Sequence, residues 1–140
     1  MIAYLSHAIG SLADSELIQR GDNIANAVDW FRYLAHATPF VMSMPWFASV
    51  AALGMELRDR ALLDQRMLLR RHDAIVFVGE GVIGHQLVER ADARRFHLAD
   101  IDLTDQGFPP PALATPADTK LRRLITRRTS EALAKVRRAL

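Results

Sequence analysis

The chain contains no cysteine and no long apolar run. Without any Cys among its 140 residues, disulfide bonds and thiolate chemistry are excluded. No apolar stretch approaches the ~18–20 residues of a membrane-spanning helix, and no basic segment precedes an apolar run at the N-terminus as it would in a secretory signal. We therefore expect a cytoplasmic protein that does not associate with membranes.

Sequence motifs for phosphate loops and metal ions are also missing. The glycines that follow the central apolar run fit neither the P-loop spacing nor Gly-x-Gly-x-x-Gly. The histidines outside that region lack the spacing of metal ligands. We therefore expect neither a metal nor a cofactor.

Charge is unevenly distributed along the chain. The net charge is +2, but the residues from Asp118 onward include eight Lys or Arg and two acidic residues, which leaves about −4 for the first 117 residues. A basic C-terminal helix has two interpretations: it binds nucleic-acid phosphates, or it packs its apolar stripe on the domain or on a second subunit with its arginines in solvent. The regular apolar stripe favours packing, so nucleic acid is not an expected partner.

Short apolar runs alternate with helical patterns, which is typical of a parallel sheet. The strands are expected at Ile2–Leu5, Phe40–Met44, Ala74–Val78 and Phe96–Ile101. The helices are expected from Asp22, as N-cap, to Pro39, from Gly54 to His72, from the loop after Val78 to Arg94, and from Asp118 to Leu140.

These patterns predict a three-layer α/β/α domain over residues 1–105, a Pro-rich linker over 106–117 and a basic amphipathic helix over 118–140. The parallel sheet should have four or five strands in the order 2-1-3-4-5. The fifth strand would lie around Asp102–Thr104, or another subunit would complete the sheet.

The stretch Asp73–Glu89 is the centre of this prediction. Ala74–Val78 is an uninterrupted apolar run, as expected for a strand buried on both faces, and the glycine-rich loop after it leads into a helix. Ligands of open α/β sheets bind at the carboxyl ends of the strands. We therefore expect this loop to form one wall of any site.

Four segments together resemble the nucleoside 2-deoxyribosyltransferase-like proteins, a group that includes deoxynucleotide N-glycosidases. They are YLSHAIGS, DNIANAVDW, an apolar-Ser-Met-Pro strand, and RDRALLDQRMLLRRHDAIVFVGEGVIGHQLVE. The resemblance covers residues 2 to 103. It implies a flavodoxin-like (Rossmann-like) sheet, cleavage or exchange of the N-glycosidic bond of deoxynucleosides or their monophosphates, and a homodimer or higher oligomer. A non-catalytic nucleotide-binding protein of the same fold is the alternative.

The family's chemistry uses a Glu that attacks the anomeric carbon, from the start of the helix after the third strand, and an assisting Asp on the preceding helix. The resemblance implies Glu89 as the nucleophile and Asp64 as the assisting acid. The family's Ser-x-Gly-x-x-x-Glu motif, counted from Gly84, reaches Val88. Counted from Gly81, it reaches His85, and the family spacing for the Asp falls on Gln65, next to Asp64.

Other residues at the strand ends are candidates with simpler alternatives. The first-strand loop would bind substrate through Tyr4, Ser6, His7 and Gly10, although a Tyr in this place is also compatible with the core and a loop His with solvent exposure. Glu80 is a catalytic candidate between two glycines or an exposed loop residue. His85 and Glu89 share a helical face at i,i+4, as catalytic partners or as a surface salt link. Asp64 could equally be a solvated surface residue. Gly81 and Gly84 would allow the backbone to approach substrate.

Overall fold

Four parallel strands form one sheet in the order β2-β1-β3-β4 in the computed structural model, which describes residues 1–8, 17–44, 65–107 and 116–140. The strands are β1 (Ile2–His7), β2 (Val41–Ser43), β3 (Ala74–Val78) and β4 (Ala99–Asp102). All three strand pairs are parallel. The predicted three-layer α/β fold is confirmed, with four strands in the described part of the chain.

The central strand β3 is buried along its whole length, as its uninterrupted apolar sequence predicted. It pairs with β1 on one side, where Ala3 aligns with Ala74, and with β4 on the other, where Ala74 aligns with Ala99. Because side chains alternate along a strand, Val76 and Val78 lie in one apolar cluster while Ile75 and Phe77 lie in the other.

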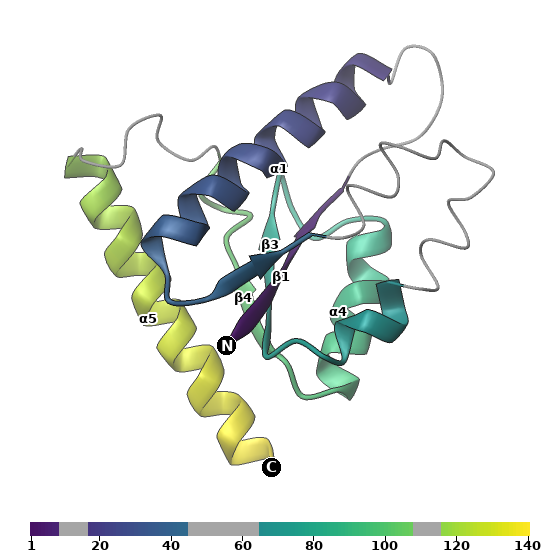
Figure 1. Ribbon diagram of the computed structural model, residues 1–140, viewed down its shortest axis with the longest axis vertical. Coiled ribbons are helices and arrows are strands. Elements are labelled where there is room, and N and C mark those ends of the chain that lie inside the picture. The colour runs from purple at the N-terminus through teal and green to yellow at the C-terminus, as the bar shows by residue number, and fades with distance from the viewer. Residues whose placement is uncertain (9–16, 45–64, 108–115) are drawn as a thin grey trace.

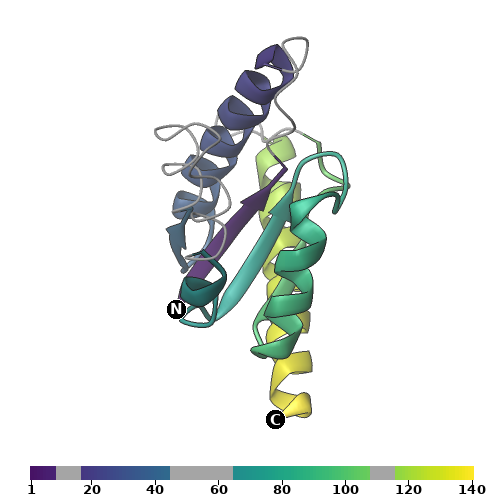
Figure 2. The same cartoon turned by 90° about the vertical axis from the view of Figure 1, so that its right-hand side faces the viewer.

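Helices cover both faces of the sheet (Figures 1 and 2). The helices α1 (Leu17–Ala37) and α5 (Pro116–Ala139) pack Trp30, Tyr33, Leu34 and Ile125 on the face that carries Leu5, Val76 and Ile101. The helix α4 (His85–Arg95) and a helical stretch over residues 65–69 pack Ala93 and Leu69 on the opposite face. In Figure 1, α4 and α5 lie on either side of β3 and β4.

The C-terminal helix packs its apolar stripe on the sheet, which agrees with the packing interpretation. Ile125 is buried in the core cluster, and partly buried apolar residues of α5 extend the contact along the helix: Leu121, Ala132, Leu133 and Val136. Within the described ranges, no helix is both long enough and apolar enough to cross a membrane.

Several expected boundaries were wrong. Strand β1 extends to His7 because Ser6 and His7 pair with Phe77 and Val78. Helix α1 begins at Leu17, before the expected N-cap Asp22, which is an exposed residue inside the helix.

At the other end of the domain, β4 begins at Ala99, since the residues before it form the turn that ends α4. The suggested fifth strand around Asp102–Thr104 is also wrong, because Asp102 ends β4 and Thr104 lies in a turn.

Candidate functional site

Glu89 lies one helical turn into α4 and points inward at the carboxyl end of the sheet. Its side chain is 4% exposed, and its Oε1 accepts a hydrogen bond of 2.9 Å from Gln65 Nε2. Val88, which the family spacing from Gly84 had marked for the nucleophile, is 38% exposed. Of these two adjacent residues, Glu89 therefore faces the protein interior.

The backbone at Gly84 marks where α4 begins. Gly84 is the N-cap of α4, with φ 55° and ψ −127°, a conformation outside the helix that a residue with a side chain rarely adopts. The first helical residue is His85, and Glu89 follows it by four residues, about one turn. His85 and Glu89 therefore share a helical face, as the sequence spacing predicted.

Burial raises the pKa of Glu89 from 4.5 to about 7. The hydroxyl of Ser6 and the amide of Gln65 act against this shift by stabilising the charged carboxylate, while the negative charge of Asp92 raises the pKa further. The Ser6 hydroxyl lies near the carboxylate without forming a hydrogen bond of full geometry. At neutral pH the carboxyl group of Glu89 is thus close to half ionised, which suits a group that changes protonation state.

Three buried polar atoms beside Glu89 have no hydrogen-bond partner. They are Glu89 Oε2, Ser6 Oγ and Gln65 Oε1. Buried polar groups in folded proteins are nearly always paired, so three unpaired oxygens on side chains that meet at one place form a buried polar cluster with unused hydrogen-bonding capacity. Glu89 Oε2 is the carboxylate oxygen left available for chemistry, since Gln65 holds the other.

Tyr4 and His85 complete the surroundings of Glu89. Tyr4 is buried in the apolar cluster on the α4 face, as the core alternative proposed, and its ring meets that of His72 edge-on at 5.5 Å. Burial and, to a lesser extent, the charge of Glu89 raise the pKa of the Tyr4 phenol well above 10.0. His85 Nε2 lies 3.9 Å from Glu89 Oε1, and because Glu89 is buried this pair is not an exposed salt link.

A buried glutamine fixes the start of α4 to the ends of two strands. Gln86 Nε2 donates to the carbonyl oxygens of Ser6 and Val78, each at 3.1 Å, and Gln86 Oε1 accepts from the backbone N–H of Ile83 at 3.3 Å. Gln86 is 1% exposed. This residue ties β1, β3 and the glycine loop together and so fixes where Glu89 lies relative to Ser6.

On the other face of the sheet, a pocket of about 670 Å³ opens beside His7. His7 is buried at the end of β1, so the alternative of a solvent-exposed loop histidine was wrong. Its Nδ1 donates to Ala8 O at 2.6 Å, and its Nε2 accepts from Asn26 Nδ2 at 2.9 Å. Burial lowers the pKa of His7, so the ring is neutral at pH 7. Glu80 also lines the pocket, and its side chain is exposed, which agrees with the alternative of an exposed loop residue.

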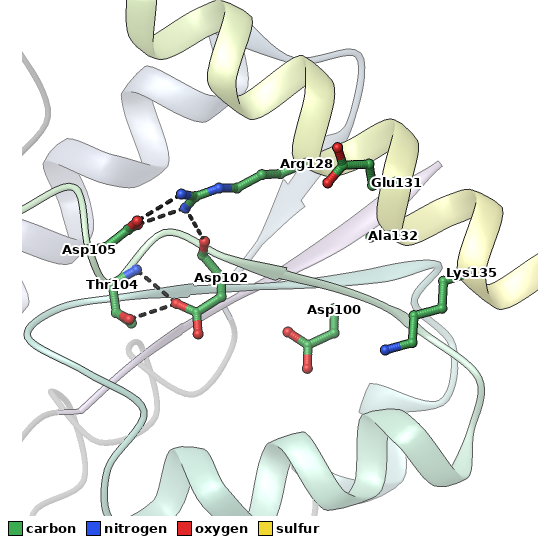
Figure 3. A pocket seen from close by; sticks show the side chains of 8 residues that line it. All are labelled: Asp100, Asp102, Thr104, Asp105, Arg128, Glu131, Ala132 and Lys135. Carbon is green, nitrogen blue, oxygen red and sulfur yellow. Dashed lines mark hydrogen bonds and ion pairs between the residues drawn. The ribbon is translucent and has the colours of Figure 1, made fainter.

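A second hollow, of about 530 Å³, lies along β4 between the sheet and α5 (Figure 3). Arg128 donates to both carboxylate oxygens of Asp105, at 2.6 and 2.7 Å, and to the carbonyl oxygen of Asp102 at 2.6 Å. Thr104 donates to Asp102 Oδ1, and Arg90 reaches Asp100 from α4 at 2.8 Å. These ion pairs connect α4, β4 and α5, which is a structural role.

The structure thus brings most of the predicted site residues to one end of the sheet, in two groups. Tyr4, Ser6 and His85 surround Glu89, while His7 and Glu80 line the pocket on the other face. Gly81 has φ 153° and Gly84 has φ 55°, both in the loop between β3 and α4. Asp64 and Gly10 lie outside the described residues.

Sequence reasoning missed Gln86 and Asn26, which are buried polar residues on otherwise ordinary helices. The only available signal was an amide on the inward face of an amphipathic pattern, which is weak. Among the described residues, no group of three or more His, Cys, Asp or Glu side chains is arranged to hold a metal ion. Comparisons with protein-family models, curated proteins and solved structures find no match to this chain.

Proposed function

We propose that the protein is an enzyme that cleaves or exchanges the N-glycosidic bond of deoxynucleosides or deoxynucleoside monophosphates, with Glu89 as the nucleophile. One observation carries the proposal: a buried carboxylate with a pKa of about 7 lies at the carboxyl end of a parallel sheet and keeps one oxygen unpaired. The order of sequence motifs that resemble the nucleoside 2-deoxyribosyltransferase-like proteins supports the same chemistry.

In the first step, Glu89 Oε2 attacks the anomeric carbon of the deoxyribose. A C–O bond to Glu89 forms as the C–N bond to the base breaks, and the base leaves with the electron pair and takes up a proton. Water then attacks the same carbon in a hydrolase, or a second base does so in a transferase, and the carboxylate of Glu89 is released. The attacking form is the ionised carboxylate, which is populated at and above pH 7.

Gln65 takes the place in which the family has an assisting acid. A neutral amide cannot donate a proton to the leaving base at neutral pH, so its contribution is to orient the carboxylate. By donating to Oε1, Gln65 leaves Oε2 as the oxygen that it does not hold. His85, whose Nε2 lies 3.9 Å from Oε1, is placed to supply the proton that the leaving base takes up.

The proposal is tested by incubating the full chain with the four common deoxynucleosides and their 5′-monophosphates and measuring free base by chromatography. We expect base release from at least one substrate, and a loss on the order of 10³-fold in kcat for Glu89→Gln. A deoxyribosyl adduct on the Glu89 peptide, detected by mass spectrometry after acid quenching, would identify the attacking atom.

Glu80→Gln is the matched control, because it removes the same charge from an exposed loop residue at the same end of the sheet. A Glu89→Gln variant as active as the wild type would exclude Glu89 as nucleophile. If no substrate releases base, the enzyme proposal fails, and a thermal-shift screen with the same compounds tests the alternative, a nucleotide-binding protein without catalysis.

A further inference from the structure

Two adjacent residues of the helical stretch 65–69 bind two acids of α4. Gln65 Nε2 donates to Glu89 Oε1 at 2.9 Å, and Arg66 donates to both carboxylate oxygens of Asp92, at 2.6 and 3.1 Å. Asp92 follows Glu89 by three residues, so the two acids share one face of α4. The ion pair between Arg66 and Asp92 is therefore the direct neighbour of the hydrogen bond that holds Glu89.

The two contacts differ in strength. An arginine that donates through two nitrogens to one carboxylate fixes both the distance and the orientation of the partners, and such a charge-assisted pair is stronger than a hydrogen bond from a neutral amide. The side chain of Asp92 is 8% exposed, and that of Arg66 is 45% exposed. Because Asp92 is buried, little water competes for its carboxylate, and Arg66 makes the firmer of the two attachments.

Apolar packing continues the same contact along both segments. Leu69 and Ala93 are fully buried and belong to one core cluster. Positions 65, 66 and 69 therefore lie along positions 89, 92 and 93, as expected for two helical segments that run side by side in the same direction. Within this row, Arg66 is the charged residue that anchors the segment next to Gln65.

We propose that Arg66 is a positioning residue for Glu89: its ion pair with Asp92 holds the segment that carries Gln65 against α4 and so keeps the Gln65 amide on Glu89 Oε1. For its consequence in catalysis the inference rests on the proposed function, because it concerns the nucleophile of that proposal. The coupling between the ion pair and the carboxyl group of Glu89 is a property of the folded chain, and it can be measured without a substrate.

The pKa of Glu89 reports whether the amide is in place, because Gln65 stabilises the ionised carboxylate. If Arg66 positions Gln65, loss of Arg66 weakens this hydrogen bond and raises the pKa of Glu89. If Arg66 acts through its charge alone, its loss leaves the negative charge of Asp92 uncompensated, which also raises this pKa. Two further titratable groups beside Glu89 are unchanged in either case: Tyr4 and His85.

A double-mutant cycle separates position from charge. The pKa of Glu89 is measured by carbon-13 NMR titration of the full chain in the wild type, Arg66→Met, Gln65→Leu and the double variant, with the Glu89 resonance assigned from Glu89→Gln. We expect Arg66→Met to raise this pKa by about half a pH unit or more, and by much less when position 65 is already leucine. Arg70→Met, the same charge change at an exposed position one turn further along, is the control and should leave the pKa unchanged.

No rise in Arg66→Met, or a rise of the same size with and without Gln65, would overturn the positioning role. If Arg66→Met does not fold, Arg66→Lys takes its place in the cycle, because lysine keeps the charge beside Asp92 and gives up the bidentate contact, and the same outcomes decide.

Activity distinguishes this inference from the proposed function. Where base release is found, Arg66→Met should lower kcat/KM about threefold at pH 6 and leave it nearly unchanged at pH 9, since a higher pKa reduces the ionised fraction of Glu89 only at low pH. An unchanged kcat/KM at pH 6 alongside a raised pKa would contradict Glu89 as the nucleophile and leave the positioning role standing. Absence of base release from every substrate refutes the proposed function, and the cycle still decides the role of Arg66.

Discussion

Gln65 and Glu89, from two helical segments on the same face of the sheet, meet through a buried hydrogen bond of 2.9 Å from Nε2 to Oε1. The bond holds one oxygen of the carboxylate and leaves the other unpaired beside Ser6. It also stabilises the charged form of Glu89, so it limits the rise in pKa that burial causes. Position 65 should therefore control the pH at which Glu89 becomes ionised.

We predict that Gln65→Leu raises the pKa of Glu89 above its value of about 7, since the substitution removes a hydrogen bond that stabilises the ionised carboxylate. If ionised Glu89 is the nucleophile, the acidic limb of the kcat profile moves to higher pH. Met67→Leu, at an exposed position of the same helical stretch, is the control and should leave the profile in place. A profile of Gln65→Leu that coincides with that of the wild type would contradict the coupling.

The buried carboxylate should also make stability depend on pH. The pKa of Glu89 is higher in the folded state than in the unfolded chain, so the folded state binds more protons between pH 4.5 and about 7. The contribution of Glu89 to stability is therefore most favourable below pH 4.5, and it becomes less favourable as the pH rises to about 7. Over that range Glu89 costs roughly 3 kcal/mol of folding free energy.

Glu89→Gln removes this cost while keeping an oxygen that accepts from Gln65. We predict that, as pH is raised from 5 to 8, the free energy of unfolding of the variant increases by roughly 2–3 kcal/mol relative to that of the wild type. The variant should also lose activity. Urea unfolding at the two pH values measures the difference. The same comparison with Glu80→Gln, at an exposed position, should show no such gain, and parallel pH dependence of wild type and Glu89→Gln would refute the prediction.

The fold was predictable because its strands are short apolar runs of distinct composition. The buried run Ala74–Val78 fixed the centre of the sheet, and the order of the strands follows from right-handed parallel connections. The boundaries were less predictable where polar residues are buried. Ser6 and His7 read as a loop, yet they continue β1 because their backbones pair with β3 and Asn26 donates to the ring of His7.

The sequence predicted that His85 and Glu89 share a helical face, but no residue count showed that Glu89 is buried while Val88 is exposed. A count of residues from a glycine gives a helical position only if the glycine itself is helical, and Gly84 is not. The count from Asp73, which precedes the strand, reached Gln65, and the structure shows Gln65 donating to Glu89. The paired roles of Gln86 and Asn26 depend on contacts between segments far apart in sequence, which no local pattern reveals.

Gln86 should be important for stability as well as for the position of Glu89. We predict that Gln86→Leu lowers the free energy of unfolding by about 3 kcal/mol, because two buried carbonyl oxygens, of Ser6 and Val78, and the part-buried backbone N–H of Ile83 lose their partner. Urea unfolding measures the loss. Leu87→Gln, at the adjacent exposed position, should change stability by less than about 0.5 kcal/mol. Similar losses for the two variants would show that Gln86 has no special role.

The end of α4 contains a strained residue. After the C-cap Phe96, His97 has φ 58°, the left-handed conformation that favours glycine. The backbone N–H of Leu98 donates to Ala93 O at 2.9 Å, and that of His97 donates to Arg94 O at 3.3 Å. This pattern of bonds is the Schellman motif, in which glycine is the usual residue at the position of His97.

We predict that His97→Gly raises the free energy of unfolding by about 1 kcal/mol, because relief of the strained φ outweighs the larger chain entropy that glycine brings to the unfolded state. His97 is exposed and its side chain contributes nothing to the core, so the substitution should leave base release unchanged. His97→Ala is the matched control: it removes the imidazole but keeps a Cβ, so the strain remains and no gain is expected. A similar gain in both variants, measured by urea unfolding at pH 8, would show that the imidazole rather than the backbone conformation is the source of the cost.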